Sequence, residues 1–511
     1  MADYNVTVSL GGVPNPTGWY SVKAYGAVGD GVTDDLGAIQ AAISAAEAAG
    51  GGVVFLPSGS YYVSAFFTMD SPNVTLCGAG ASSRIIAATG SGAFVCKTSA
   101  ANLKIRDIAF VGGVSTEPVA ANECISMLSG TENIEISGCL FTGTDATHGF
   151  NVQIRGHSGC VNPRIVNNHF ERVIGTNSGY GYGIQMASVA GGVIEGNVSI
   201  QTTTQGRHHI YLSATCSDIA VSANRLKGGV SAMITCYSAT TAGKRMTITG
   251  NTLDGLGTGG GTGGAVELVG PMESCTVVGN AIHDSDGYGV KLEGAAASEC
   301  IYNVVTGNTI TNPDLGGIYV RGAESTVIQG NSIINAGGGT AAIYLQAPGA
   351  TTANGTLVSG NIVAGTGHLY AVSLAGSNVA VFGNSFTAGA SGTYAVTDPT
   401  KRYILGNNDS ESPKVFTAIR TAADGDTTPT VGGVRTLLIG ANTGATAITQ
   451  LDDAVAGQQV TLVWTSATNP STIADSGNFN LAGAFTASVD DTLTLFTVDG
   501  TNWREVARAQ N

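Results

Sequence analysis

Histidine and basic side chains gather in one part of an otherwise acidic chain. The sequence has 511 residues and a net charge of −14, yet five of its seven His fall between His148 and His209. The densest point is the run Arg207, His208, His209, Ile210, Tyr211. A cation beside the carboxylate of a uronate sugar acidifies the C5 proton, which a nearby base can then remove. We therefore expect Arg207 to neutralise the carboxylate, His208 or His209 to be the base, and Tyr211 to be the acid.

A second interpretation of this cluster stays open, because the same side chains could line turns and hydrogen-bond the backbone. Polar and aromatic residues elsewhere in the repeated region are expected to contact a substrate, namely Arg155, Gln185, Lys227 and Tyr237.

A pair of carboxylates offers an alternative centre. Glu267 and Glu293 are expected one turn of the chain and two residues apart, or roughly 8 Å from strand geometry. This separation lies within the range of an inverting glycosidase pair. Lys291, Tyr319 and Arg321 surround them in the sequence and are also expected to bind substrate. The competing interpretation is a salt-bridge ladder that joins Glu267 to Lys291 and Glu293 to Arg321.

A repeated phrase organises the chain that must position these groups. A small residue, then Asn, then an apolar residue recurs with spacings between 23 and 30 residues. A period of this length predicts a solenoid, in which stacked repeats bury one continuous core. The Asn side chains are expected inside turns, bonded to the backbone or to the next Asn along the stack. They are Asn168, Asn197, Asn224, Asn251, Asn280, Asn308, Asn331, Asn361, Asn384 and Asn407.

A second phrase of alternating apolar and polar residues lies about midway between the Asn positions. Such alternation indicates a strand with one buried face. Aligning the copies predicts one outward row: Asn151, Gln185, Tyr211, Thr235, Glu267, Lys291, Tyr319, Tyr344 and Ser373. A second row lies two residues further on: Gln153, Ala187, Ser213, Tyr237, Val269, Glu293, Arg321, Gln346 and Ala375. The predicted fold is an all-β, right-handed parallel β-helix on whose face a sugar chain could lie along the axis.

The chain is expected to have three parts. Residues 1–61 form a lead-in and a cap, with a helix that begins at Thr33 or Asp34 and stops at Gly50–Gly52. Residues 62–411 form the β-helix. Residues 412–511 lose the Asn period, show longer alternating runs, and are expected to form a β-sandwich that serves trimerisation or sugar binding.

The block from Val22 to Tyr61 resembles the opening of the pectate-lyase-like superfamily, which includes many phage tailspikes and bacterial alginate epimerases. The resemblance implies a capped β-helix, a homotrimer, and a place in a virion tail or outside the cell. The Arg207-His208 pair is similar to one in the epimerases. Their Asp-Pro-His motif is replaced here by His148–Gln153, which argues against epimerase activity. The segments Asn442–Thr449 and Asp499–Trp503 resemble the C-terminal modules of phage tail proteins.

Composition excludes several other classes of protein. The net charge argues against a nucleic-acid partner, and no apolar run is long enough to span a membrane. The first residues lack the basic and apolar regions of a secretory signal. The nine Cys show no CxxC spacing and are expected to be reduced core residues. No cofactor and no metal are expected.

These patterns together predict a polysaccharide depolymerase, and we favour a lyase that cleaves an acidic, uronate-containing substrate by β-elimination. The alternatives are a glycoside hydrolase that uses Glu267 and Glu293, and a receptor-binding tail fibre without turnover.

Overall fold

The computed structural model divides into two compact units, with the division close to residue 411. The structure describes residues 18–88, 96–113, 123–171, 173–175, 180–201, 206–255, 263–294, 300–346, 355–374, 379–396, 402–405, 408–409, 419–432, 434–454 and 457–510. The expected lead-in before residue 18, together with Ala375 and Asn407, lies outside these ranges.

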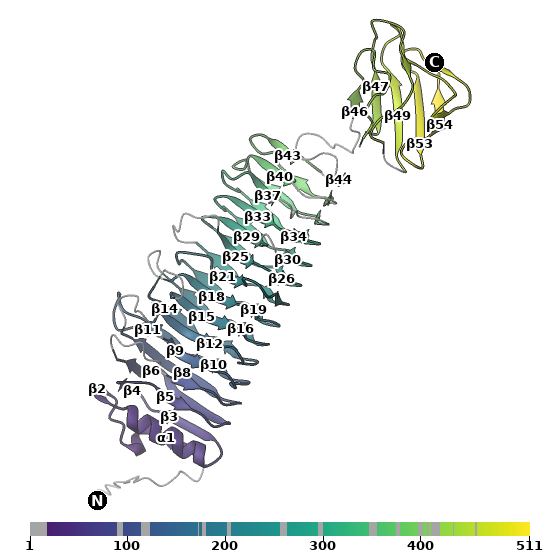
Figure 1. The fold of residues 1–511 in the computed structure, drawn as a ribbon. Coiled ribbons are helices and arrows are strands. Elements are labelled where there is room, and N and C mark those ends of the chain that lie inside the picture. Colours follow the sequence, from purple (N-terminus) through teal and green to yellow (C-terminus); the bar gives the residue numbers. More distant parts are fainter. Residues whose placement is uncertain are drawn as a thin grey trace, which may run out of the picture. The chain divides into compact units, whose positions relative to one another are not determined.

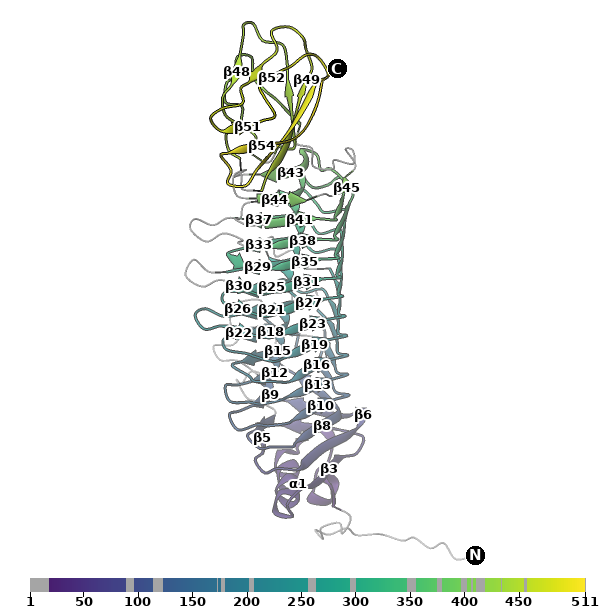
Figure 2. The same ribbon diagram turned by 90° about the vertical axis from the view of Figure 1, so that its right-hand side faces the viewer.

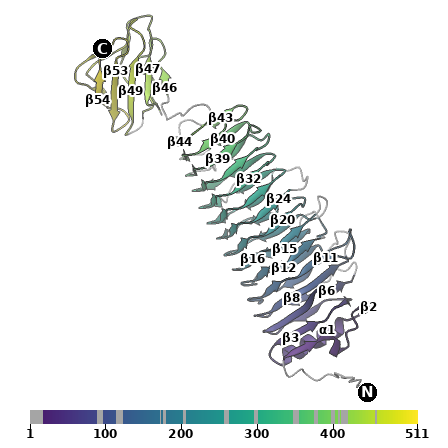
Figure 3. The same cartoon turned by 180° about the vertical axis from the view of Figure 1, so that it is seen from behind.

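The first unit is a parallel β-helix, as the repeats predict (Figures 1 and 2). One strand of each turn joins a 13-stranded parallel sheet, and most other strands join a 28-stranded sheet, counted over the described residues. A separate four-stranded sheet is made by β22 (Gly243–Lys244), β26 (Met272–Glu273), β30 (Cys300–Ile301) and β34 (Ala323–Glu324). Figure 3 gives the opposite side, where β16 (Val193–Glu195) and β20 (Arg225–Lys227) of the larger sheet lie. The strands of the 13-stranded sheet are β5 (Phe67–Met69), β7 (Cys96–Thr98), β9 (Glu123–Met127), β12 (Val152–Gly156), β15 (Tyr182–Ala187), β18 (His208–Ser213), β21 (Ile234–Tyr237), β25 (Gly264–Val269), β29 (Tyr288–Glu293), β33 (Gly316–Arg321), β37 (Ala341–Gln346), β40 (Tyr370–Leu374) and β43 (Gly392–Val396).

The repeated Asn residues form a buried ladder, which confirms the prediction for Asn168 to Asn384. Asn251 is representative: its Nδ2 donates to Val221 O and to Asn280 Oδ1, each at 2.9 Å. Its Oδ1 accepts from the backbone N–H and the Nδ2 of Asn224, each at 2.9 Å. Each side chain thus satisfies buried groups of two neighbouring turns, and this fixes the register of the stack.

Helix α1 (Leu36–Ala48) covers the N-terminal end of the stack (Figure 1). Its buried residues Ile39, Ala42, Ile43 and Ala46 follow helical spacing, and the helix packs on β1 (Trp19–Ser21), β3 (Gly52–Leu56) and β5. The N-cap residue is Asp35, one position beyond the expected start. Its carboxylate accepts from the backbone N–H of Gly29 at 2.9 Å.

The second unit contains a six-stranded and a three-stranded sheet, in accordance with the expected sandwich. The six-stranded sheet contains β46 (Ile419–Thr421), β47 (Thr436–Ile439), β49 (Gln459–Trp464), β53 (Thr492–Thr497), β54 (Trp503–Ala509) and β51 (Phe479–Asn480). Trp464, Phe485 and Trp503 are fully buried in the hydrophobic core of the second unit. The three-stranded sheet is made by β48 (Ala447–Ile448), β50 (Thr472–Ile473) and β52 (Phe485–Thr486).

All nine Cys are buried free thiols, as the composition predicts. Burial raises the pKa of the Cys96 thiol well above its usual range and that of Cys160 to about 12, so these groups are unreactive core residues. In the described part of the chain no helix is long and apolar enough to cross a membrane.

Candidate functional site

The outer face of the 13-stranded sheet carries two rows of side chains, and the strand register tests the predicted alignment. In the first row Gln185 lies beside Tyr211, then Thr235, Glu267 and Lys291. The row goes on through Tyr319, Tyr344 and Ser373. The second row, from Ala187 to Gln346, is also confirmed, and it contains Ser213, Tyr237, Val269, Glu293 and Arg321. Neighbouring residues in each row are about 4.8 Å apart along the axis.

The predicted alignment is wrong at β12. Arg155, not Asn151, lies beside Gln185. Asn151 and Gln153 are buried, and their amides donate to the carbonyls of Ile174 and Glu171 at 2.9 and 2.5 Å. The two amides therefore hydrogen-bond backbone carbonyls of their own turn. The outward residues are Arg155 on β12 and His157 directly after it.

The two adjacent His of β18 lie in different environments. His209 is buried, with Nδ1 2.6 Å from Ser199 Oγ and Nε2 3.0 Å from Gly228 O. Both of its ring nitrogens are thus occupied within the turn, and burial lowers its pKa to about 4. The expectation that His209 could be a base is wrong, because its ring has no open nitrogen.

His208 lies on the outer side with aromatic neighbours. Its ring stacks on Tyr182 and Tyr211 at 5.6 and 5.2 Å between centroids. Its Nδ1 is 2.7 Å from Ala232 O, and only 4% of the residue is exposed. Burial lowers the pKa of His208 to about 3, so the ring is neutral and weakly basic at neutral pH.

Arg207 and Tyr211 complete this aromatic group. Arg207 Nη1 donates to Tyr182 Oη at 2.9 Å, and the guanidinium lies 6.0 Å from the centre of that ring. Burial, with a smaller contribution from Tyr182, raises the pKa of Tyr211 to about 12. The Tyr211 hydroxyl therefore keeps its proton at neutral pH, as a general acid must. Of the four expected catalytic residues, the structure brings together Arg207, His208 and Tyr211.

A carboxylate, an arginine and a histidine meet at Glu123 of β9, Arg155 of β12 and His157 directly after β12, and the sequence did not predict this group. Glu123 Oε1 accepts from Arg155 Nη1 at 2.6 Å, and Oε2 is 3.1 Å from His157 Nε2. Ser126 Oγ is 2.9 Å from the same His157 nitrogen. The Glu123 side chain is 2% exposed, whereas Arg155 and His157 are 27% and 30% exposed.

Glu123 is ionised in this group. Burial alone would raise the pKa of Glu123, but hydrogen bonds from His157 and Ser126 and the charge of Arg155 outweigh that effect and lower it. A carboxylate at Nε2 holds the proton on that nitrogen and leaves Nδ1 with its lone pair. Among the described residues, Nδ1 of His157 has no hydrogen-bond partner. The group therefore combines a buried anion, an oriented imidazole and a partly exposed cation.

The carboxylates of β25 and β29 have different surroundings. Glu293 accepts from Lys291 Nζ at 2.7 Å and from Arg321 Nη1 at 3.0 Å. The predicted Glu293–Arg321 contact is confirmed. Lys291, however, pairs with Glu293 in its own strand, and no Glu267–Lys291 ion pair occurs among the described residues. Residues two apart on a strand share a face, which allows this pairing.

The pKa values of these two carboxyl groups move in opposite directions. Burial raises the pKa of Glu267, although the Lys291 charge and the Gly264 N–H at 3.0 Å oppose it. Burial also acts on Glu293, but Lys291 and Arg321 outweigh it and lower the Glu293 pKa. An acid and a base that act as a pair need pKa values displaced in opposite directions, as these are. Both Glu293 oxygens are held by cations, however, and this weakens them as proton acceptors.

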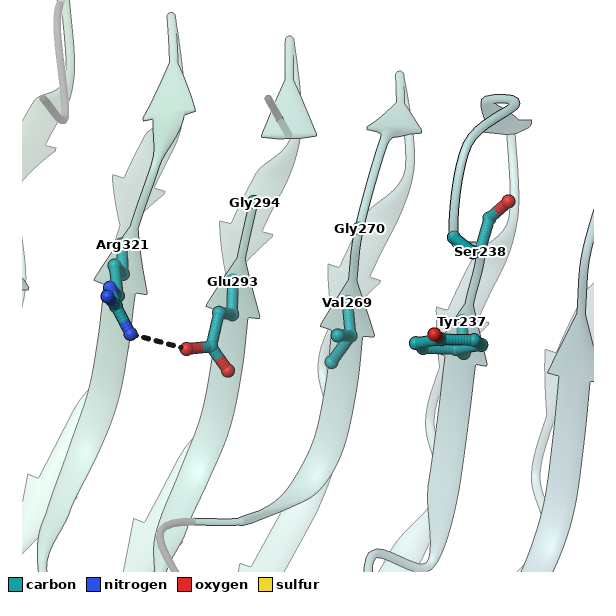
Figure 4. A pocket seen from close by; sticks show the side chains of 8 residues that line it. Tyr237, Ser238, Val269, Gly270, Glu293, Gly294 and Arg321 are labelled. Carbon is teal, nitrogen blue, oxygen red and sulfur yellow. Dashed lines mark hydrogen bonds and ion pairs between the residues drawn. The ribbon is translucent and has the colours of Figure 1, made fainter. Parts of the chain in front are cut away.

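A pocket of about 350 Å³ opens beside Glu293 and Arg321 (Figure 4). Tyr237, predicted to bind substrate, lines it and is 40% exposed. Tyr319 does not line it: this residue is 6% exposed and its hydroxyl donates to Gln346 Oε1. Lys227, expected to bind substrate, lies away from this face: β20 belongs to the 28-stranded sheet, and Lys227 Nζ is 2.9 Å from Asp254 Oδ2.

Solved structures with this fold come from enzymes and phages. The A-module of mannuronan C-5 epimerase AlgE6 from Azotobacter vinelandii aligns at 19% identity with a TM-score of 0.52, over 76% of this chain and 99% of that one. The pre-mature bacteriophage phi29 gene product 12 aligns at 15% identity with a TM-score of 0.51, over 90% and 64%. The tailspike of E. coli bacteriophage HK620, solved with a pentasaccharide, aligns at 12% identity with a TM-score of 0.50, over 74% and 78%. At these identities the likeness shows the fold alone.

Sequence relatives match a short segment. Mannuronan C5-epimerase AlgE1 of Azotobacter vinelandii is 53% identical over 74 residues, which are 13% of this chain and 5% of that protein. Alginate lyase 7 of the same organism is 69% identical over 45 residues, which are 9% and 5%. The matched segments are therefore a small fraction of these relatives.

Family models cover most of the first unit. Residues 19–260 match the model described as rhamnogalacturonase A/epimerase, pectate lyase-like, and residues 260–409 match the right-handed β-helix region. With the parallel sheets and the Asn ladder described above, these matches make the chain a pectate-lyase-like right-handed β-helix protein.

Proposed function

We propose that this protein cleaves a uronate-containing polysaccharide by β-elimination, with His157 as the base. The observation that carries the proposal is the Glu123 carboxylate, which contacts His157 Nε2 at 3.1 Å and Arg155 Nη1 at 2.6 Å. It holds an imidazole and a guanidinium side by side at the surface of one strand. These are the two groups that removal of a C5 proton beside a carboxylate needs.

The proposed reaction assigns one role to each group. The exposed part of the Arg155 guanidinium pairs with the uronate carboxylate. Nδ1 of His157 takes the C5 proton, and the buried Glu123 anion stabilises the imidazolium that forms. The electron pair makes a C4–C5 double bond as the C4–O bond breaks. Water gives a proton to the leaving oxygen.

Two observations favour this centre over His208. The His208 ring is almost fully buried and its pKa is about 3, whereas a base works best with a pKa near the pH of the reaction. Beside His157, moreover, the second row holds the small residues Ala187 and Ser213, which leave space for sugar rings.

Hydrolysis by Glu267 and Glu293 is the second candidate, because their pKa values are displaced in opposite directions. Lyase and hydrolase give different products. An unsaturated product absorbs in the ultraviolet, whereas hydrolysis gives new reducing ends without that absorbance. Binding without either product would identify a receptor-binding tail fibre.

The test measures ultraviolet absorbance with a panel of uronate polysaccharides: alginate, pectate, hyaluronan and bacterial capsules. His157→Ala should lower turnover by about 10²-fold or more, the scale of general-base loss. The control is His283→Ala, because His283 lies in the 28-stranded sheet with Nδ1 2.6 Å from Thr311 Oγ1. Full activity of His157→Ala would refute the assignment. Solvent deuterium at C5 of recovered substrate, without cleavage, would instead indicate epimerisation.

The assembly and location are part of the same proposal. We expect a homotrimer in a virion tail or outside the cell, with the second unit serving trimerisation or sugar binding. A bacteriophage tailspike and a second bacteriophage protein among the structural neighbours support this expectation.

A further inference from the structure

The pocket beside Glu293 has the dimensions and lining of a site for one sugar residue. Its volume of about 350 Å³ lies at the lower end of the range for small-ligand pockets. Short side chains create the space, and the lining residues lie on or just after the neighbouring strands β21, β25, β29 and β33 (Figure 4). The lining residues are Tyr237, Ser238, Ala239, Val269, Gly270, Glu293, Gly294 and Arg321.

Backbone geometry at Gly270 maintains the pocket. Gly270 has φ of 81°, and a Cβ added there would lie 1.7 Å from the Ser238 carbonyl oxygen. No other residue fits this position, so the turn that closes the pocket depends on glycine.

Tyr237 offers an open aromatic surface. Its neighbours in the second row are Ser213 and Val269, both smaller than an aromatic ring. Tyr182 and Tyr211, in contrast, stack on each other at 5.0 Å, and Tyr288 and Tyr319 at 4.7 Å. In the described part of the chain Tyr237 has no such ring partner, and 40% of it is exposed. The apolar C–H face of a sugar can pack on a ring of this kind.

The charges around the pocket are balanced. Glu267 and Glu293 supply two carboxyl groups, and Lys291 and Arg321 supply two cations. Glu293 is 25% exposed and faces the pocket, so an incoming carboxylate would meet this anion beside Arg321. At Arg155 the partner carboxylate is 2% exposed, so an incoming carboxylate would not meet it at the surface. The two arginines therefore differ in the ligand that they favour.

Sugar hydroxyl groups fit the Glu293–Arg321 ion pair better than a carboxylate does. A hydroxyl donates one hydrogen bond and accepts others. It can donate to Glu293 and accept from Arg321 without separating them. We propose that this pocket binds a neutral hexose or N-acetylhexosamine residue, so that the substrate is a heteropolysaccharide in which such a sugar recurs with a uronate.

The position of the pocket along the sheet face limits which polysaccharides can bind. Tyr237 lies on β21, the third strand beyond β12 in the sheet order, and so about 14 Å along the axis from the His157 strand. A chain bound at both places must present a uronate at His157 and a neutral sugar further along the same face. The conclusion about the polymer rests on the proposed function, whereas the neutral-sugar site does not.

Saturation-transfer NMR with methyl glycosides tests the site itself. The probes are the methyl glycosides of glucose, galactose, mannose and N-acetylglucosamine, with methyl glucuronide for comparison. At least one neutral probe should receive saturation and methyl glucuronide should receive less. Tyr237→Ala should weaken that binding about fivefold, and Ala239→Trp, at an exposed lining position, should abolish it by filling the pocket. Tyr302→Ala is the control, since Tyr302 is 60% exposed and outside the pocket.

The site would be disproved if no neutral probe binds, if methyl glucuronide binds equally well, or if Tyr237→Ala and Ala239→Trp leave binding unchanged. A second assay compares kcat/KM on hyaluronan, in which glucuronate alternates with N-acetylglucosamine, and on polymannuronate. We expect a higher value on hyaluronan, with Tyr237→Ala raising KM and leaving kcat nearly unchanged. Equal or better cleavage of polymannuronate would overturn the heteropolysaccharide conclusion. Glycoside binding without cleavage of either polymer would count against the proposed function alone and support the site.

Discussion

Removal of one Asn from the buried ladder should destabilise the β-helix by several kcal/mol. In Asn251→Ala the lost side chain had four hydrogen bonds of 2.9 Å, to Val221, Asn280 and two groups of Asn224. Asn251 is 1% exposed, so water cannot replace it without opening the turn. The backbone N–H and the Nδ2 of Asn224 and the Val221 carbonyl lose a partner. At about 1–3 kcal/mol for each buried group left unsatisfied, with partial relaxation, we expect a loss of about 3–5 kcal/mol.

The assay is urea unfolding followed by circular dichroism, beside a control at the adjacent position. Thr252 begins β24 (Thr252–Asp254) and is exposed, so Thr252→Ala should change stability by about 0.5 kcal/mol or less. A loss below about 1 kcal/mol in Asn251→Ala would refute the reasoning. It would mean that the ladder fixes register without contributing much to stability.

Three further predictions concern Glu123 and the oligomeric state of the protein. Glu123→Gln should lower turnover about 10- to 100-fold by removing the anion that orients His157; unchanged kinetics would contradict this. The pKa of Glu123 is lowered on folding from 4.5, so its ionisation stabilises the protein above that pH and the contribution disappears as pH falls through the folded value. The melting temperatures of wild type and Glu123→Gln should therefore converge below about pH 4.5, and a constant difference would disprove the linkage. Analytical ultracentrifugation of the full chain should give three times its mass of 51.3 kDa; a monomer would exclude the trimer.

The sequence predicted the repeated architecture because each turn restates the same local pattern. Gln185, Tyr211 and Thr235 lie in one row because strand alternation and the Asn period each fix their place. The prediction failed at Asn151, where two buried amides imitate the alternation of an outward strand while bonding a loop within the same turn. Polarity alone does not separate an amide that faces solvent from one that satisfies a buried carbonyl.

Contacts between turns were the least predictable part of the site. Glu123 and His157 are 34 positions apart and meet only because β9 and β12 are neighbours. Glu123 lies where the Asn repeat is irregular, so no periodic signal placed it opposite His157. His209 was misplaced for another reason: its ring is held by Ser199 and Gly228, whereas the ring of the adjacent His208 stacks on Tyr211.

The rigidity of the stack is what connects the two proposed sites. The separation of His157 and Tyr237 is set by whole strands, about 4.8 Å each, and the Asn ladder holds those strands in register. Side-chain motion cannot change this separation by a full strand. A flexible polysaccharide must therefore adjust its own conformation until a uronate and a neutral sugar meet their places together. Selection among polymers then depends on the order of the sugars in the repeat. A polymer with suitable sugars in the wrong order should occupy one site and leave the other empty.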